Sequence, residues 1–148
     1  MDKKIMPPTY FIILLFLSIG IHFVFPVIKL ISPPYNYLGI LIIILGIILN
    51  LWTDLLFKKK QTTVKPHKMP SFFISSGPFR ISRHPMYLGM ALILLGVAVF
   101  LGSLISFVFP IIFIVIMEKL FIPIEEKNLE KKFGNKYIAY KKRVRKWI

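Results

Sequence analysis

A long stretch without charge sets the strongest limit on how this chain can fold. No Asp, Glu, Lys, Arg or His occurs from Met86 to Met117. As one helix rising about 1.5 Å per residue, this stretch would be about 48 Å long, whereas the hydrocarbon core of a bilayer is about 30 Å thick. Gly102 and Ser103 lie near its middle. The stretch therefore predicts a helical hairpin of two membrane spans, residues 85–101 and 104–122.

Two further apolar runs precede this hairpin. They cover residues 10–31 and 37–57, and the consecutive prolines Pro33 and Pro34 predict a turn between them. Because 56% of the 148 residues are hydrophobic, a soluble domain of this size could not bury them all. The expected fold is an all-α integral membrane protein with four transmembrane helices, and residues 1–148 are expected to form a single domain.

The basic residues fit this topology. With four spans, all of the 20 Lys and Arg residues except Lys29 fall on one side of the membrane, as the positive-inside rule requires. Both termini are therefore predicted to be cytoplasmic. This placement beside anionic lipid headgroups accounts for the net charge of +14 and makes nucleic acid a poor partner. The absence of cysteine excludes disulfides, thiolate metal sites and a catalytic thiol, and no metal site is predicted.

The C-terminal segment, residues 125–148, differs from the spans. Apolar residues recur there every three or four positions among basic ones, which predicts an amphipathic helical segment broken near Gly134 and Asn135. We expect this segment to lie on the cytoplasmic, anionic lipid surface. The apolar stripe consists of Leu129, Phe133, Tyr137, Tyr140, Val144 and Trp147.

A first polar cluster lies directly before the hairpin. His84 and Pro85 open the third span, and proline suits the first turn of a helix because its missing N–H is not needed there. The N-terminus of that helix offers backbone N–H groups to an anion, and Arg83 and His84 add side-chain donors. From the residues alone, these two side chains could equally anchor the helix to lipid phosphates.

A second polar cluster, Glu125 and Glu126, follows the hairpin on the same predicted membrane face. The two carboxylates could simply complement the dipole of a helix that begins there. Alternatively, a carboxylate could accept hydrogen bonds from a ribose diol, as acidic residues do in nucleotide sites. Tyr87 could face a cationic group with its ring or serve as an interfacial residue.

Together these residues resemble a known family. The run Gly77-Pro78-Phe79-x-x-x-Arg83-His84-Pro85-x-Tyr87-x-Gly89 resembles the signature of the isoprenylcysteine carboxyl methyltransferases. The pattern Glu125-Glu126-x-x-Leu129-x-x-x-Phe133-Gly134-x-x-Tyr137-x-x-Tyr140-x-x-Arg143-Val144 is similar to the C-terminal half of that family. Residues 84–87, followed by a hairpin and a Glu pair, also resemble phospholipid N-methyltransferases of the same superfamily. The resemblance covers residues 62–148.

The resemblance implies an integral membrane enzyme that uses S-adenosylmethionine. It implies a cofactor pocket at the cytoplasmic face, closed by the C-terminal segment and braced by Tyr137 and Tyr140. The implied cofactor-binding residues are Ser71, Phe72, Phe73, Ile74, Phe79, His84, Pro85, Met86, Tyr87 and Glu125. The candidate catalytic residues are Arg83, Glu126 and Arg143.

The chain departs from the family pattern at Phe121. Many carboxyl-methylating relatives have an arginine there that contacts the substrate, and phenylalanine cannot supply its bidentate fork. Either Lys119, Arg83 or Arg143 replaces that arginine, or the methyl acceptor is another group, such as an amine or hydroxyl on a lipid. The acceptor class therefore stays open.

The expected function is direct in-line methyl transfer to a lipophilic acceptor, an isoprenoid or a lipid, by positioning and exclusion of water. An amine or phenol acceptor would need a base, for which Glu126 and His84 are candidates. The alternative from another class is a small four-helix transporter or a non-catalytic membrane scaffold. It would use Asp54 or Glu118 as a membrane-embedded charge, although both lie beside lysines near span ends.

Overall fold

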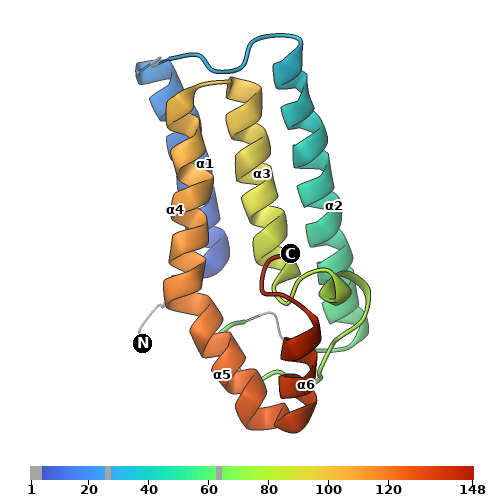
Figure 1. The fold of residues 1–148 in the computed structure, drawn as a ribbon. Coiled ribbons are helices and arrows are strands. Elements are labelled where there is room, and N and C mark those ends of the chain that lie inside the picture. Colours follow the sequence, from blue (N-terminus) through green and yellow to red (C-terminus); the bar gives the residue numbers. More distant parts are fainter. Residues whose placement is uncertain (1–4, 26–27, 63–64) are drawn as a thin grey trace.

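The computed structural model describes residues 5–25, 28–62 and 65–148. Within these ranges the chain forms helices and connecting turns and no strand, which confirms the predicted all-α class. Long helical segments lie side by side, and shorter helices and loops cover one end of them (Figure 1). The α-helices are α1 (Pro7–Val24), α2 (Leu38–Lys59), α3 (Pro85–Leu101), α4 (Val108–Ile116), α5 (Ile122–Phe133) and α6 (Asn135–Arg143).

Among the described residues, three helical segments are long and apolar enough to cross a membrane. They are Pro7–Val24, Tyr35–Lys59 and Leu104–Phe133. α3 is also apolar but has only 17 residues, and it packs between α2 and α4. The described residues therefore form a multi-pass helical protein suited to a membrane.

α2 and α3 meet where neither helix carries a side chain. Gly39 lies against Gly96, and Gly46 lies against Gly89. A Cβ added at Gly46 would come within 2.6 Å of the Gly89 carbonyl oxygen, and one at Gly96 within 2.7 Å of the Gly39 carbonyl oxygen. Small residues allow helix backbones to approach this closely, as they commonly do in membranes. The contact fixes the start of α3 beside the last turns of α2.

The predicted break between the third and fourth spans is present. α3 ends at Leu101 and is capped by Gly102, which has a left-handed conformation with φ 68°, and a helical turn resumes at Leu104. The Gly102 carbonyl accepts hydrogen bonds from the N–H groups of Leu30 at 2.7 Å and Ile31 at 3.2 Å. The Leu104 N–H donates to the Ile28 carbonyl at 3.1 Å. The connection between α1 and α2 is therefore hydrogen-bonded to the connection between α3 and α4.

The first helix is shorter than the predicted span of residues 10–31. α1 ends at Val24, and Phe25 already has non-helical angles, φ −126° and ψ 80°. The next residue in the sequence is Pro26, and a residue that precedes proline is disfavoured in the α conformation. The predicted end at Ile31 is therefore wrong, because the helix stops before this proline.

The last helix is longer than the predicted span, which was expected to end at Ile122. A π-helical turn at Met117–Phe121 joins α4 to α5, so one helical rod continues to Phe133. Pro123 follows this turn and lacks the N–H that a regular helix would use, and the wider π turn accommodates the change in hydrogen bonding. The rod carries Glu125 and Glu126 to the end of the bundle where α3 begins.

The apolar core lies between α1, α3 and α4. Leu94 on α3, Phe113 on α4 and Met117 in the π turn are fully buried, and Leu14 contributes from α1. Many large apolar side chains on the outer faces of α1 and α2 are exposed, as expected of helices that face lipid. The core fixes the spacing of the helices whose ends carry the polar clusters.

Candidate functional site

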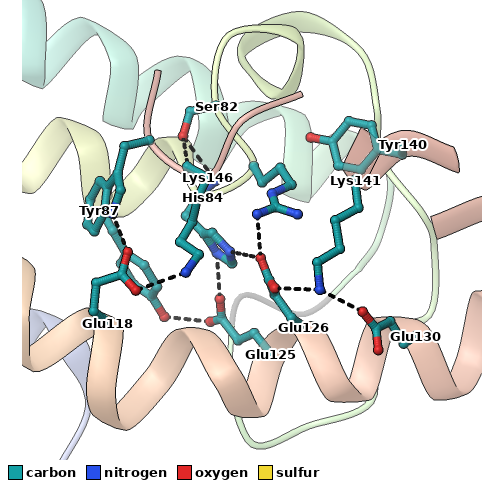
Figure 2. Close-up of polar contacts among 12 residues, drawn as sticks. Ser82, His84, Tyr87, Glu118, Glu125, Glu126, Glu130, Tyr140, Lys141 and Lys146 are labelled. Atoms are coloured by element: carbon teal, nitrogen blue, oxygen red, sulfur yellow. Dashed lines mark hydrogen bonds and ion pairs between the residues drawn. The ribbon is translucent and has the colours of Figure 1, made fainter. Parts of the chain in front are cut away.

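The two polar clusters meet at one end of the bundle (Figure 2). The Nδ1 atom of His84 lies 3.0 Å from Oε2 of Glu125, and its Nε2 atom lies 3.4 Å from Oε1 of Glu126. The hydroxyl of Tyr87 donates to Oε1 of Glu125 at 2.5 Å. The first turn of α3 is therefore tied to α5, and the prediction that the two clusters meet is confirmed.

His84 is held with a carboxylate opposite each ring nitrogen. Its side chain is buried, and only the imidazolium form can donate from both nitrogens. Burial alone would lower the pKa of His84, but the hydrogen bonds and negative charges of Glu125 and Glu126 outweigh burial and raise this pKa above its ordinary value. The site therefore favours a positively charged His84.

Glu126 is buried between two cations. Its Oε1 atom lies 3.2 Å from Nη2 of Arg83, and its Oε2 atom lies 3.1 Å from Nζ of Lys141. Lys141 also pairs with Glu130 at 2.8 Å. Glu126 thus draws α6 and the segment before α3 together on one side of α5.

Arg83 uses only part of its guanidinium in these contacts. Its side chain is 8% exposed, yet its Nε and Nη1 atoms are buried without a partner among the described residues. The hydroxyl of Tyr137 is buried without a partner in the same part of the structure. Leaving a buried donor unpaired costs about 1–3 kcal/mol, so these groups have hydrogen-bonding capacity to spare beside the site.

Two adjoining hollows lie beside these groups. The larger encloses about 620 Å³ including its opening to solvent, and the smaller encloses about 310 Å³. Phe57, Phe79, Arg83 and Glu125 line both of them. The hollows therefore adjoin, and Arg83 and Glu125 lie where they meet.

The predicted cofactor residues lie around this site with one exception. Ser71 lines neither hollow; it is exposed, and its N–H donates to the Thr62 hydroxyl at 3.1 Å. Phe72, Phe73 and Ile74 line the larger hollow. The smaller hollow is lined by His84, Pro85, Met86 and Tyr87, and both are lined by Phe79 and Glu125.

The three candidate catalytic residues are not all brought together. Arg83 lines both hollows, and Glu126 lies directly behind it through their ion pair. Arg143 is exposed, is the last residue of α6 and lines neither hollow. α6 instead turns Tyr137, Tyr140 and Lys141 toward the site, so Arg143 is not placed to touch a ligand there.

The residue that stands in place of the family arginine, Phe121, is packed among apolar groups. Its ring is 3% exposed and makes an edge contact with the ring of Tyr10, at 5.8 Å between centroids. Lys119 is exposed and lines neither hollow. Of the three cations considered as replacements for the family arginine, Arg83 is therefore the one that lines the site.

The aromatic stripe of the C-terminal segment faces the protein and not lipid. Tyr137 and Tyr140 are buried, and the ring of Phe73 lies 6.0 Å and 5.3 Å from their rings. The Tyr140 hydroxyl donates to the Phe79 carbonyl at 2.6 Å. For these two residues the expectation that the segment lies on lipid is wrong, because the loop before α3 presents an apolar surface to them. The expectation that they brace the pocket agrees with their position. They form a wall of the larger hollow.

Phe57 is a site residue that the sequence reasoning missed. It comes from α2, lines both hollows and packs edge-on against Phe79, at 5.6 Å between ring centroids. It is the last apolar residue before Lys58-Lys59-Lys60, where the chain leaves the apolar layer. This position, at the predicted membrane face where His84 also lies, is the feature of the sequence that could have identified Phe57 as a site residue. It shows that α2 shapes the site.

Asp54 and Glu118, the charges considered for a transporter, are both paired. Asp54 lies 2.6 Å from Nζ of Lys58, one turn further along α2. Glu118 lies 2.9 Å from Nζ of Lys146 and accepts a hydrogen bond from the Trp147 indole at 2.7 Å. Neither is an isolated charge within the apolar segments.

Comparison with known proteins agrees with this arrangement. The sequence profile of the phospholipid methyltransferase family matches residues 35–136, which include both polar clusters. An uncharacterized protein of Haemophilus influenzae is 43% identical over 63 residues, which make up 43% of this chain and 100% of that protein. The matched profile covers more than half of the 148 residues. The chain therefore belongs to the phospholipid methyltransferase family, part of the same superfamily of membrane methyltransferases as the isoprenylcysteine carboxyl methyltransferases.

Proposed function

We propose that this protein is an S-adenosylmethionine-dependent methyltransferase that acts at the cytoplasmic membrane face on a lipophilic acceptor, an isoprenoid or a lipid. The observation that carries the proposal is a hollow lined by Arg83 and Glu125, beside which two buried Arg83 nitrogens have no partner among the described residues. The family supplies the reaction class, methyl transfer. The geometry favours binding of the methyl donor in the hollows lined by Arg83 and Glu125.

The residues around the hollows suit each part of S-adenosylmethionine. The spare donors of Arg83 suit its carboxylate, because hydrogen bonds from a guanidinium to a carboxylate are charge-assisted. Glu125 has lone pairs left to accept from the ribose diol. The rings of Phe73, Phe79 and Tyr137 suit adenine and the sulfonium charge. When bound, this cofactor supplies an activated methyl group.

The ion pairs beside the hollows hold the site in shape. Glu126 fixes the orientation of Arg83 from behind, and Lys141 fixes Glu126 from α6. Tyr140 closes the loop against α6 through its bond to the Phe79 carbonyl. These contacts fix the polar groups before a ligand arrives and keep water away from them, which is how positioning lowers a transfer barrier.

The two candidate bases are already engaged. His84 lies between Glu125 and Glu126 in a setting that favours its protonated form, and Glu126 is paired with Arg83 and Lys141. A protonated His84 has no lone pair left to accept a proton, and a proton on Glu126 would weaken its ion pairs with Arg83 and Lys141. The site therefore favours an acceptor that reacts as a carboxylate, a phenolate or an already neutral amine.

The proposal also places the protein in the membrane. It counts α3 as a fourth, short span, treats residues 1–148 as one domain and puts both termini and the site on the cytoplasmic side. Lys29, the cation left over on the other side, pairs with Ser103 in a β-bridge beside Gly102, at the far end of the bundle from His84. The acceptor's tail would enter between helices, while its head meets the smaller hollow.

A methyl-transfer assay tests the proposal. Purified protein in lipid micelles would receive methyl-labelled S-adenosylmethionine together with lipophilic carboxylates, phenols or amines. We expect label in the lipid extract with one of these classes, loss of this label in Glu125→Gln, and retention in Asp54→Asn, a matched acidic residue paired away from the hollows. A folded wild type that neither binds the labelled cofactor nor transfers its methyl group would contradict the proposal.

A further inference from the structure

The chain does not end at α6. The C-terminal tail, residues Val144–Ile148, leaves α6 in an extended conformation and returns to the start of α3 (Figure 1). None of its residues lines either hollow. The tail nevertheless forms hydrogen bonds with the segment before α3, which contains Arg83, a residue that lines both hollows.

One edge of the tail is hydrogen-bonded to the segment before α3. The Arg83 N–H donates to the Arg145 carbonyl at 3.1 Å, and the Ser82 hydroxyl donates to the Lys146 carbonyl at 2.9 Å. The same Ser82 oxygen accepts the His84 N–H at 3.1 Å. The Ser82 hydroxyl thus links the backbone of the tail to the backbone of His84.

The tail is also held by Glu118 (Figure 2). One carboxylate oxygen of Glu118 lies 2.9 Å from Nζ of Lys146, and the other accepts the Trp147 indole N–H at 2.7 Å. Trp147 packs against the apolar core. Glu118 itself lies in the π-helical turn Met117–Phe121 and lines neither hollow.

A carboxylate on a helix that continues an apolar span is costly unless it is partnered. Glu118 has both oxygens partnered, and both partners come from the tail. The π turn, the tail and the segment before α3 therefore form a continuous chain of polar contacts. It runs behind the site, on the side away from Lys141.

We infer that Glu118 is a positioning residue, which docks the tail and thereby fixes Ser82, Arg83 and His84 at the distance from Glu125 and Glu126 that the site requires. This inference rests on the proposed function, since the site it positions is the proposed cofactor site. Glu118 acts through Lys146 and Trp147 and does not touch the ligand.

The test uses the full chain with the substitution Trp52→Phe, which leaves Trp147 as the single tryptophan of the sequence. Three readouts are compared in Glu118→Ala, Glu118→Gln and Lys146→Met: Trp147 emission with acrylamide quenching, the pH dependence of the thermal midpoint, and the Kd for S-adenosylhomocysteine. The control is Asp54→Ala, which removes a carboxylate of similar exposure, 36% against 32%, from a Lys pair elsewhere.

We expect Glu118→Ala to shift Trp147 emission to the red and open it to acrylamide. The pH dependence should weaken, because His84 moves relative to the groups that face it: Glu125, Glu126 and Tyr87, with Arg83 and Lys141 behind Glu126. The Kd should rise about tenfold, equivalent to about 1.4 kcal/mol. Glu118→Gln, which keeps an acceptor for Trp147, should recover most of each effect, and Asp54→Ala should show none.

Two results would overturn the inference. In one, Trp147 keeps its emission in Glu118→Ala and Lys146→Met, so Glu118 does not dock the tail. In the other, Trp147 is released while the pH dependence and the Kd stay unchanged, so the tail does not position the site. A wild type that binds no S-adenosylhomocysteine would count against the proposed function instead, and the fluorescence and pH readouts would still decide the role of Glu118.

Discussion

The α2–α3 contact and the polar site below it hold the same helix by opposite means. Gly39, Gly46, Gly89 and Gly96 bring the two backbones together because they have no side chains. At the start of α3, by contrast, His84 and its neighbours are held by side chains that reach across to α5 and α6.

This difference separates two kinds of dependence. Adding atoms to the glycine contact pushes α3 away from α2 and lowers stability, and the site is disturbed only as a consequence. Removing donors from the polar site leaves the packing in place and takes away the groups that a ligand would use. The predictions below separate the two effects, beginning with the largest.

Arg83→Lys should weaken S-adenosylhomocysteine binding by about 10- to 100-fold. Lysine keeps the charge that faces Glu126 but loses the Nε and Nη1 donors, and each hydrogen bond to a charged group is worth about 1.5–3 kcal/mol. Titration calorimetry measures the affinity, and the ligand-free thermal midpoint should barely change. Arg80→Lys, at an exposed cation in the preceding helical turn, is the control. Equal affinities for wild type and Arg83→Lys would remove Arg83 from the cofactor site.

Gly96→Val should lower the free energy of unfolding by about 1–3 kcal/mol, the usual cost of overpacking. Its Cβ would lie 2.7 Å from the Gly39 carbonyl oxygen and 2.8 Å from the Ile43 amide nitrogen. Denaturation in detergent measures the change. Gly20→Val is the matched control, because a Cβ at Gly20 on α1 meets nothing within 4 Å. If the two variants were equally stable, the close α2–α3 contact would not be what holds α3.

Two tyrosines on α6 should behave differently when each loses its hydroxyl. Tyr140→Phe removes the bond to the Phe79 carbonyl and should cost about 1 kcal/mol of stability without ligand. Tyr137→Phe removes a hydroxyl that has no partner among the described residues, so it should keep or raise this stability and weaken S-adenosylhomocysteine binding instead. Thermal midpoints and calorimetry distinguish the two, and the reverse pattern would contradict the assignment of both hydroxyls.

The smallest expected effect is a pH dependence from His84. Its pKa is raised in the folded protein, so the stabilisation it gives is complete below the ordinary histidine value of about 6.5 and is lost as pH rises through the higher folded pKa. The thermal midpoint of the wild type should therefore fall over that range, and His84→Asn should flatten the profile. His67→Asn serves as the control. A midpoint that rises with pH through this range, and does so only when His84 is present, would show that the sign is wrong.

The meeting of His84 with Glu125 was predictable from the sequence. A charge-free stretch too long for one span must turn, and the turn at Gly102 returns the chain to the end of the bundle from which it started. The proposed cofactor residues on that hairpin follow from their position in the motif. The helix limits were less predictable. The fourth span was expected to end at Ile122, but a π turn before Pro123 lets the helix continue to Phe133.

The rest depends on contacts that a sequence pattern does not contain. The amphipathic spacing in the C-terminal segment shows which face of a helix is buried, but not that Tyr137 and Tyr140 pack against Phe73 instead of lipid. Phe57 reaches the site only because glycine contacts bring α2 against α3. The stripe of the C-terminal segment includes Trp147, but its spacing does not show that Trp147 and Lys146 reach back to Glu118.

Calorimetric titration of detergent-purified protein with S-adenosylhomocysteine tests the central claim most directly. The account predicts saturable binding of one molecule per chain, weakened at least about tenfold by Glu125→Gln, which removes the charge shared by His84 and Tyr87. No binding by a well-folded wild type, or equal binding by wild type and Glu125→Gln, would contradict the claim that this end of the bundle holds the cofactor.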